Sequence, residues 1–133
     1  MTAGEAGQGA GAGAVIGARA RHAPARLRRS GEVRAVLARR QRRTGRYMVV
    51  HGHDRGDSAP PRATVVAGRR VGRAVDRNRA KRRLRAGLRE VGVEPGHDVV
   101  VVARPRAVTA PFKGLCSELA ALLPGGRDGA PDD

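Results

Sequence analysis

The spacing of apolar residues predicts an amphipathic helix and then two strands in the first half of the chain. After Ser30, which can serve as an N-cap, three apolar residues recur at helical intervals: Val33, Val36 and Leu37. Two β-branched runs come next, at residues 47–51 and 62–67, and a polar loop with two prolines joins them. Because this loop is short, we expect the two runs to pair as an antiparallel hairpin.

The second half of the chain predicts a helix, a buried strand and a final helix. Across residues 73–91, apolar residues at offsets of three and four form a narrow stripe: Ala80, Leu84, Gly87, Leu88 and Val91. Glycine lowers helix propensity, so Gly87 predicts a close approach of this stripe to the sheet. Residues 99–103 are apolar without alternation, which is typical of a strand buried on both faces. The last helix is predicted between Thr109 as its cap and Pro124 as its stop.

The predicted order of elements is helix, strand, strand, helix, strand, helix. This order indicates a small α/β sandwich of the α+β kind, with helices packed on a short central sheet. One domain is expected at residues 25–123. Residues 1–24 are rich in Gly and Ala and residues 124–133 in Gly and Pro, and neither segment has a lasting period, so both are predicted to be disordered.

The charge of the chain narrows the range of functions. Its 133 residues contain 27 Lys and Arg against 12 Asp and Glu, a formal net charge of +15, which favours nucleic acid as the partner. A membrane surface also attracts cations, but it requires bulky apolar anchors, and the chain has no Trp, one Tyr and one Phe. The sequence shows no secretory signal or membrane span. Its single cysteine, Cys116, forms no internal disulfide, so a cytoplasmic location is expected.

Positive charge is most concentrated on the predicted helix at residues 73–91. Ten of the 21 residues from Arg69 to Arg89 are Arg or Lys, and only Asp76 opposes them. Opposite the apolar stripe, one row of polar residues, here called the basic ridge, contains Asn78, Arg82, Arg85 and Arg89. Guanidinium groups bind phosphate oxygens through a planar fork of donors, so the ridge is predicted to bind RNA. The alternative is a solvated face that only keeps the protein soluble, but such a face normally mixes both signs of charge.

A metal-dependent enzyme is a weaker interpretation. Metal-ligating residue types gather in one strand end and loop: His51, His53, Asp54 and Asp57. Their spacing does not match the HxHxD ligand run of metallo-hydrolases, because Asp54 comes one residue too early, so a polar surface loop is preferred. Cys116 lies on the apolar stripe of the last helix and is interpreted as part of the core instead of a nucleophile.

Several segments, in a fixed order, resemble the protein subunit of bacterial ribonuclease P. The segment GRRVGRAVDRNRAKRRLR resembles the family's signature region, and ARLRRSGEVRAVL, YMVV and the last helix extend the resemblance over residues 26–123. The resemblance implies a protein that binds a large catalytic RNA, and this RNA uses Mg²⁺ to remove the 5′ leader from precursor transfer RNA. The catalytic groups would belong to the RNA, and no metal ligand is assigned in this chain.

The resemblance also implies roles for individual residues. Together with the ridge, the RNA-binding set comprises Arg69, Arg70, Arg73, Arg77, Asn78, Arg79, Lys81, Arg82, Arg85 and Arg89. Gly72 would permit the tight turn that enters the helix. A cleft for the leader is implied between the first helix and the sheet, at Val33, Leu37, Tyr47 and Val50. The crossover from the second strand through the basic helix to the third would be left-handed, whereas general rules predict a right-handed one.

The implied cleft departs from the family in its lack of aromatic rings. The family often places rings there that stack on leader nucleotides, and this chain offers only Tyr47. The leader contact is therefore expected to depend more on arginines and aliphatic packing. The main alternative for the whole chain is a ribosomal or other structural RNA-binding protein, which would share its size, charge and compartment. No obligate protein partner is predicted.

Overall fold

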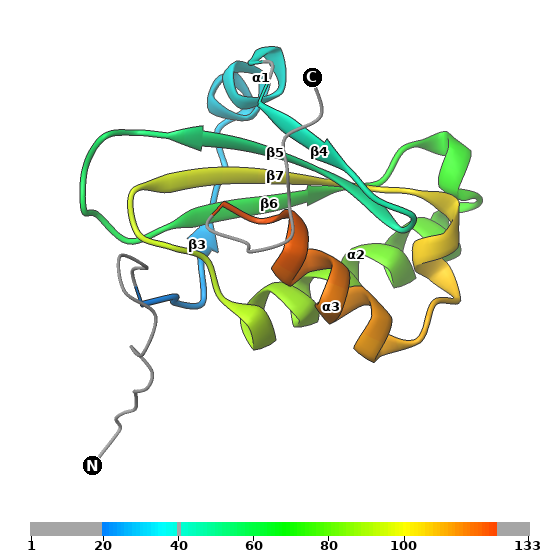
Figure 1. Ribbon diagram of the computed structural model, residues 1–133. Coiled ribbons are helices and arrows are strands. Elements are labelled where there is room, and N and C mark those ends of the chain that lie inside the picture. Colours follow the sequence, from blue (N-terminus) through cyan, green and yellow to red (C-terminus); the bar gives the residue numbers. More distant parts are fainter. Residues whose placement is uncertain (1–19, 40, 125–133) are drawn as a thin grey trace.

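A five-stranded sheet separates α1 on one face from α2 and α3 on the other (Figure 1). The computed structural model describes residues 20–39 and 41–124. The predicted fold class is confirmed. The strands are β3 (Ala25–Arg26), β4 (Arg42–Thr44), β5 (Met48–Asp54), β6 (Arg62–Val66) and β7 (His97–Ala103). The helices are α1 (Ser30–Ala38), α2 (Ala74–Val91) and α3 (Phe112–Leu122), with short 3₁₀ turns η1 (Arg69–Val71) and η2 (Pro105–Val108).

The strand order is β3-β6-β7-β5-β4, so β7 lies at the centre of the sheet. β6 is parallel to β7, and β5 is antiparallel to it, with Val65 and Val50 both opposite Val101. The hairpin predicted for β5 and β6 is therefore wrong. The physical reason is that β7 is apolar on both faces. At the centre of the sheet, between β5 and β6, it has helices over both of these faces. The handedness of the crossover from β6 through α2 to β7 stays a prediction.

The sequence pattern predicted the bounds of the helices better than it predicted their cap residues. α2 has Arg73 as its N-cap residue and ends at Val91, as predicted. α1 starts at Ser30 itself, after an extended Arg29, and α3 starts after Pro111, so Ser30 and Thr109 are not the cap residues. Neither helix has a side-chain cap hydrogen bond, which indicates that tertiary packing holds these helix starts.

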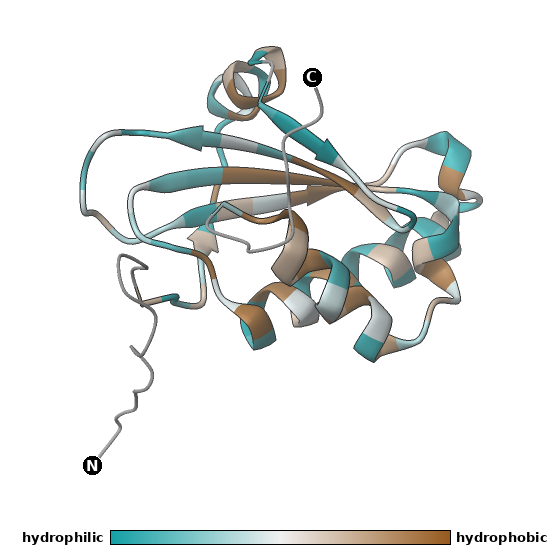
Figure 2. Cartoon of the chain, viewed as in Figure 1, coloured by the Kyte–Doolittle hydropathy of each residue, from teal (hydrophilic) through white to brown (hydrophobic). Residues whose placement is uncertain are grey.

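The main core lies between the sheet and the pair α2 and α3. Alternate residues of the three central strands supply its sheet side: Met48, Val50, Ala63, Val65, Val99, Val101 and Ala103. From the helices come Ala80, Leu84, Leu88, Leu115 and Leu119, all buried. Figure 2 shows the hydrophobic residues concentrated along β7. The opposite face of the sheet carries a smaller cluster under α1, with Leu27, Val36 and Val100 at its centre.

Gly87 marks the closest packing of α2, but its partner is α3 and not the sheet. A Cβ at Gly87 would lie 2.7 Å from Cδ1 of Leu119 and 3.9 Å from Sγ of Cys116. The absence of a side chain at Gly87 therefore lets the two helices approach each other. The predicted close approach is confirmed in kind, and the predicted partner is wrong because α3 shares the apolar stripe of α2 with the sheet.

The folded part of the chain begins before residue 25. His22 and Val93 exchange two backbone hydrogen bonds of 2.8 Å, which attach the chain ahead of β3 to the segment after α2. Residues 20–24, inside the segment predicted to be disordered, thus have defined contacts. The rest of that prediction, residues 1–19, and nearly all of the predicted tail lie outside the described residues.

A buried carboxylate connects the α1 face of the sheet to the loop before β6. Asp98 on β7 accepts hydrogen bonds from Arg62 Nε (2.9 Å), Arg62 Nη2 (2.7 Å) and Arg55 Nη1 (2.5 Å). Arg62 also donates to Glu32 of α1 at 3.1 Å. Burial disfavours the ionised form of Asp98, but the bonds from Arg62 and Arg55 outweigh it, so the pKa of Asp98 lies below its usual value. This network fixes α1 over the sheet.

Candidate RNA-binding surfaces

The basic ridge lies on the side of α2 that faces away from the core. Ala80, Leu84, Gly87 and Leu88 are buried on the inner side, as the stripe predicted. On the outer side Asn78, Arg82 and Arg89 are exposed, whereas Arg85 is half-buried because it leans toward the edge of the sheet. No hydrogen bond or ion pair from Arg82, Arg85 or Arg89 is found within residues 20–39 and 41–124, so their guanidinium groups are available to a ligand.

The turn that enters α2 depends on Gly72. Gly72 has φ +138°, a conformation that side chains rarely allow, and a Cβ there would lie 2.6 Å from Oδ2 of Asp76. Asp76 accepts a hydrogen bond from the Arg73 amide at 3.3 Å, and Arg77 Nη1 donates to the Gly72 carbonyl at 2.9 Å. The turn exposes Arg69 and Arg70 at the start of the ridge. The tight turn implied for Gly72 is therefore present.

Two arginines beside the ridge hold the protein together. Arg83 donates to the carbonyls of Ala107 (2.7 Å), Val108 (3.1 Å) and Ala110, and Arg79 Nε donates to Val108 at 3.1 Å. These bonds attach η2 to α2. Arg79 remains exposed and can also meet RNA, but part of its donor capacity is already used. The sequence places Arg79 and Arg83 on one flank and gives no sign that η2 supplies their acceptors.

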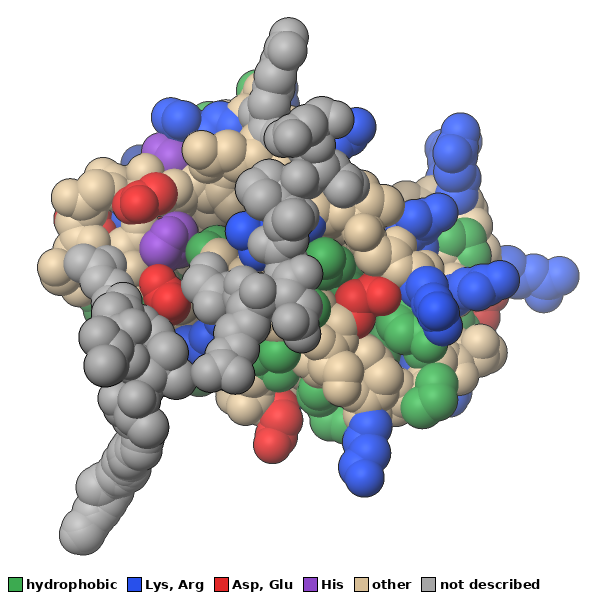
Figure 3. Space-filling model, in the orientation of Figure 1, with side chains coloured by type: hydrophobic (Ala, Val, Ile, Leu, Met, Phe, Trp, Pro, Cys, Tyr) green, Lys and Arg blue, Asp and Glu red, His purple; other side chains and the backbone are tan. Residues whose placement is uncertain are grey.

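Positive charge extends beyond α2 to the end of the molecule that carries η1 and η2. In Figure 3, Lys and Arg side chains project around this end, at the right of the view. The exposed residues there include Arg69 and Arg70 of η1, and Arg106 of η2. Acidic residues that could neutralise them are few, since Glu118, for example, is bonded to backbone amides of Arg46 and Tyr47. The surface therefore favours an extended polyanion.

The four residues implied to line the leader cleft do not lie together. Val33 and Leu37 pack on the α1 face of the sheet. Val50 is buried in the main core on the opposite face, and Tyr47 packs beside it, near Gly114 of α3. The implied cleft is thus corrected: Val50 points away from α1, because neighbouring residues of a strand point to opposite faces, and Tyr47 precedes β5 and packs on the main core. On β5, the residues on the α1 face are Val49, His51 and His53.

A broad hollow lies between α1 and the sheet. It has a volume of about 730 Å³, and its walls are Arg26, Leu27, Arg28, Ser30, Val33, Arg34, Thr64 and Val66. We call it the α1 hollow. Three arginines, Arg26, Arg28 and Arg34, thus border the hollow beside aliphatic residues. The run ARLRR supplies two of them, but Arg26 lies opposite Ala63 in the parallel pair of β3 with β6, so its side chain is on the face of the sheet away from α1.

His51 adds a neutral polar group to the α1 face of the sheet. Its side chain is 91% buried, and its Nδ1 has no hydrogen-bond partner in the described part of the chain. Burial, followed by the nearby charge of Arg42, lowers the pKa of His51, so the ring is neutral at pH 7. Sequence reasoning considered His51 only as a metal ligand.

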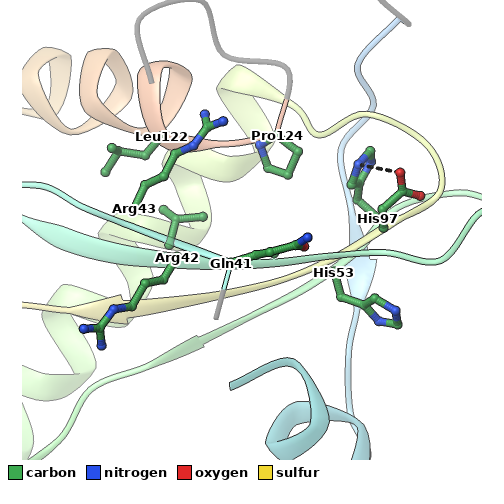
Figure 4. Close-up of a pocket in the computed structure, with 10 residues that line it drawn as sticks. Gln41, Arg42, Arg43, His53, His97, Leu122 and Pro124 are labelled. Atoms are coloured by element: carbon green, nitrogen blue, oxygen red, sulfur yellow. Dashed lines mark ion pairs between the residues drawn. The ribbon is translucent and has the colours of Figure 1, made fainter. Parts of the chain in front are cut away.

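A second hollow, of about 230 Å³, lies where β4, the ends of β5 and β7 and the end of α3 meet. Figure 4 shows Arg43 directed toward Leu122 and Pro124, whereas Arg42 is directed away. Nη1 of Arg43 donates a hydrogen bond to the Leu123 carbonyl at 3.4 Å. Nε2 of His97 lies 4.0 Å from Oδ2 of Asp54. Among the residues described, no three His, Cys, Asp or Glu side chains lie close enough together to hold a metal. The geometry thus gives no support to the metal-site alternative.

Cys116 is only half-buried and is not one of the buried residues of the main core. It packs against Gly87 at the contact of α2 with α3, and burial, together with the charge of Glu90, raises the pKa of its thiol. A thiol with a raised pKa is a poor nucleophile at neutral pH. No helix in the described residues is both long and apolar enough to cross a membrane.

Comparison with known proteins decides the family. The model of the family described as Ribonuclease P matches residues 22–125. This chain belongs to the ribonuclease P protein family. A ribonuclease P protein component from Acidothermus cellulolyticus is 44% identical over 101 residues, covering 74% of this chain and 84% of the relative. One from Streptomyces avermitilis is 44% identical over 109 residues, covering 74% and 88%.

Solved structures of the family share the fold. The ribonuclease P protein from Thermotoga maritima superposes with a TM-score of 0.60 at 26% identity, over 71% of this chain and 90% of that one. The Staphylococcus aureus ribonuclease P protein gives the same TM-score at 20% identity and 71% and 87% coverage, which supports the fold alone. Family membership places the chain in processing of the transfer RNA 5′ end, together with the family's RNA subunit. The ribosomal alternative is set aside.

Proposed function

We propose that α2 binds the catalytic RNA of ribonuclease P through the basic ridge, while the α1 hollow binds the 5′ leader of precursor transfer RNA. The observation that supports this most is the state of the ridge: its guanidiniums are exposed or half-exposed, and they have no partner in the described chain. They are carried by an 18-residue helix that is anchored in the core. Because the helix backbone is already ordered, only the side chains of this row have to be ordered when they bind phosphates.

Catalysis in this proposal belongs to the RNA. The chain contributes binding and positioning, and Mg²⁺ acts with the RNA in cleaving the phosphodiester that joins leader to transfer RNA. The protein stabilises the complex by neutralising phosphates that would otherwise repel one another. It therefore lowers the Mg²⁺ concentration that the RNA requires. A cytoplasmic site of action follows from this role.

The leader contact follows from the corrected parity of the sheet. Arg28 and Arg34 are placed to meet leader phosphates in the α1 hollow, beside the aliphatic surface of Val33 and Val66. The Glu32–Arg62–Asp98 connection sets the position of α1 and thereby the width of the hollow.

Reconstitution with the catalytic RNA tests the proposal. At a Mg²⁺ concentration too low for the RNA alone, adding the folded protein is expected to restore cleavage of precursor transfer RNA. A folded protein that gives no stimulation would refute the proposed function.

Replacing Arg82 by Ala should weaken binding of the catalytic RNA and reduce the slope of log K against log salt by about one. Replacing exposed Arg46, on the turn between β4 and β5, removes the same charge away from the ridge and is the matched control. An unchanged slope for Arg82→Ala would show that Arg82 does not contact phosphate.

Leader binding has its own measurement. The variant Arg34→Ala is expected to lower affinity for precursor transfer RNA while sparing mature transfer RNA, because only the precursor carries a leader. Arg46→Ala again serves as the control. Equal loss of affinity for both RNAs would place Arg34 outside the leader path.

A further inference from the structure

A smaller hollow of about 200 Å³, here called the edge pocket, lies between the edge of β6 and the second half of α2. The function proposed above assigns it no role. Its walls combine two kinds of side chain. One wall is apolar and contains Pro24, Ala63, Val65 and Leu88, and around it stand three arginines, Arg26, Arg85 and Arg89. Two of these arginines belong to the basic ridge.

The three arginines of the edge pocket differ from those that hold the fold together. Arg55, Arg62 and Arg83 are bonded to carboxylates or carbonyls. Arg26, Arg85 and Arg89, by contrast, have no hydrogen bond or ion pair anywhere in the described chain. The carboxylate of Glu90, next to Arg89 in sequence, is near enough to Cys116 of α3 to raise the pKa of that thiol, so Glu90 lies on the α3 side of α2. Three like charges around one hollow repel one another, and an anion relieves that repulsion.

The edge of β6 supplies backbone groups to the same pocket. β3 pairs with Arg62 and Ala63 only, and the Leu27 amide makes the last bond, to the Ala63 carbonyl. Residues two apart in a strand present their N–H and C=O groups on the same edge. The N–H and C=O groups of Val65 therefore lie on this edge beyond β3, where no further strand pairs among the described residues. Such a donor and acceptor pair can bond the edge of a base.

A bare phosphate would contact only the arginines of the edge pocket. A nucleotide would also contact the apolar wall and the backbone groups of Val65 through its base. We propose that the edge pocket binds one unpaired nucleotide of the catalytic RNA, with its base against Pro24 and Leu88 and its phosphate on Arg26, Arg85 and Arg89. The inference rests on the proposed function, because the ridge brings this RNA to the pocket. A paired base cannot enter, since its edges and faces are occupied within the duplex. The ridge arginines in its wall favour the catalytic RNA over the leader.

A charge placed at Pro24 tests the proposal without altering the ridge. Pro24→Glu puts a carboxylate beside the three arginines, and Pro24→Gln adds nearly the same volume without charge. Pro24→Glu should lower affinity for the catalytic RNA about tenfold, which is roughly 1.4 kcal/mol, relative to Pro24→Gln. Thermal unfolding of both variants shows whether they fold alike. Chemical probing of the RNA in the complex should show one unpaired nucleotide protected by wild type and by Pro24→Gln, and exposed with Pro24→Glu.

Two results would overturn the proposal. Equal affinity of the two variants for the catalytic RNA would show that the pocket takes no phosphate. Loss of precursor affinity alone, with catalytic RNA binding intact, would assign the pocket to the leader. Failure of the proposed function is distinguishable, because the wild-type protein itself would then fail to stimulate cleavage.

A measurement on the free protein separates a nucleotide from a phosphate. By NMR, a nucleoside 5′-monophosphate should shift the signals of Leu88 and Val65 more than inorganic phosphate at equal concentration. Equal shifts from both would reduce the site to a simple anion site and refute the role of the apolar wall. Pro24→Glu should abolish the nucleotide shifts, and Pro24→Gln should keep them.

Discussion

Replacing Asp98 by Asn should destabilise the protein, because two guanidiniums lose the buried carboxylate that they share. The carboxylate is 95% buried and accepts three bonds, from Arg55 and Arg62. Removing one partner of a buried ion pair costs about 3–5 kcal/mol. The side chain of Arg62 is one-third exposed and regains some hydration, so we expect a loss of about 2–3 kcal/mol in the free energy of unfolding. Urea unfolding at pH 7 measures it, with exposed Glu90→Gln as the control.

The pH dependence of this loss provides the sharper test. The pKa of Asp98 is lowered in the folded protein, so the carboxylate contributes stability above its unfolded pKa, near 3.8, and loses that contribution as pH falls through its lower folded value. The difference between wild type and Asp98→Asn should therefore be constant from pH 7 to 5 and shrink in more acidic solution. A difference below about 1 kcal/mol at pH 7, or one that persists unchanged in acid, would refute the ion-pair reasoning.

Two other substitutions and one pH titration test separate features. Gly72→Ala should cost about 1–3 kcal/mol, because the residue has φ +138° and its Cβ would meet Asp76; wild-type stability on urea unfolding would refute the strain. Glu118→Gln should cost about 1 kcal/mol, since it weakens the bonds to the amides of residues 46 and 47; hydrogen exchange of those two amides should quicken, and unchanged exchange would contradict the contact. His51, with a lowered pKa, should make the protein lose stability as pH falls below about 6.5, where the unfolded chain gains the proton more readily. An NMR titration that gives His51 a pKa at or above 6.5 would contradict this.

Local periodicity was enough to predict α2 and the burial of β7 on both faces. The stripe from Ala80 to Leu88 repeats at helical offsets, and burial of one side is the only arrangement that leaves its arginines in water. The unbroken apolar run at residues 99–103 is typical of a strand that is covered on both faces. Both predictions use information contained within a single element, and both are confirmed.

The predictions that failed needed information from distant parts of the chain. The loop between β5 and β6 is compatible with a hairpin. The two strands are separated in the sheet because β7 pairs with both of them and lies between them. The leader-cleft assignment failed for Val50 because the face to which it points is fixed by pairing of β5 with β7. Likewise, Arg82 and Arg83 look alike in the sequence, but of these two only Arg83 donates to carbonyls of η2. The edge pocket needs β3, and two residues are too few to be recognised from a pattern.

The central place of β7 has a consequence for how the chain folds during synthesis. β7 is the last strand to leave the ribosome, yet β5 and β6 both need it as their neighbour. Until residue 103 emerges, β5 and β6 each lack their neighbour along one edge. The sheet can form only when contacts between residues distant in sequence become possible. Assembly is thus late and concerted. A nascent chain arrested before His97 should show no protected amides in β5 or β6, and release of the next few valines should protect both strands together.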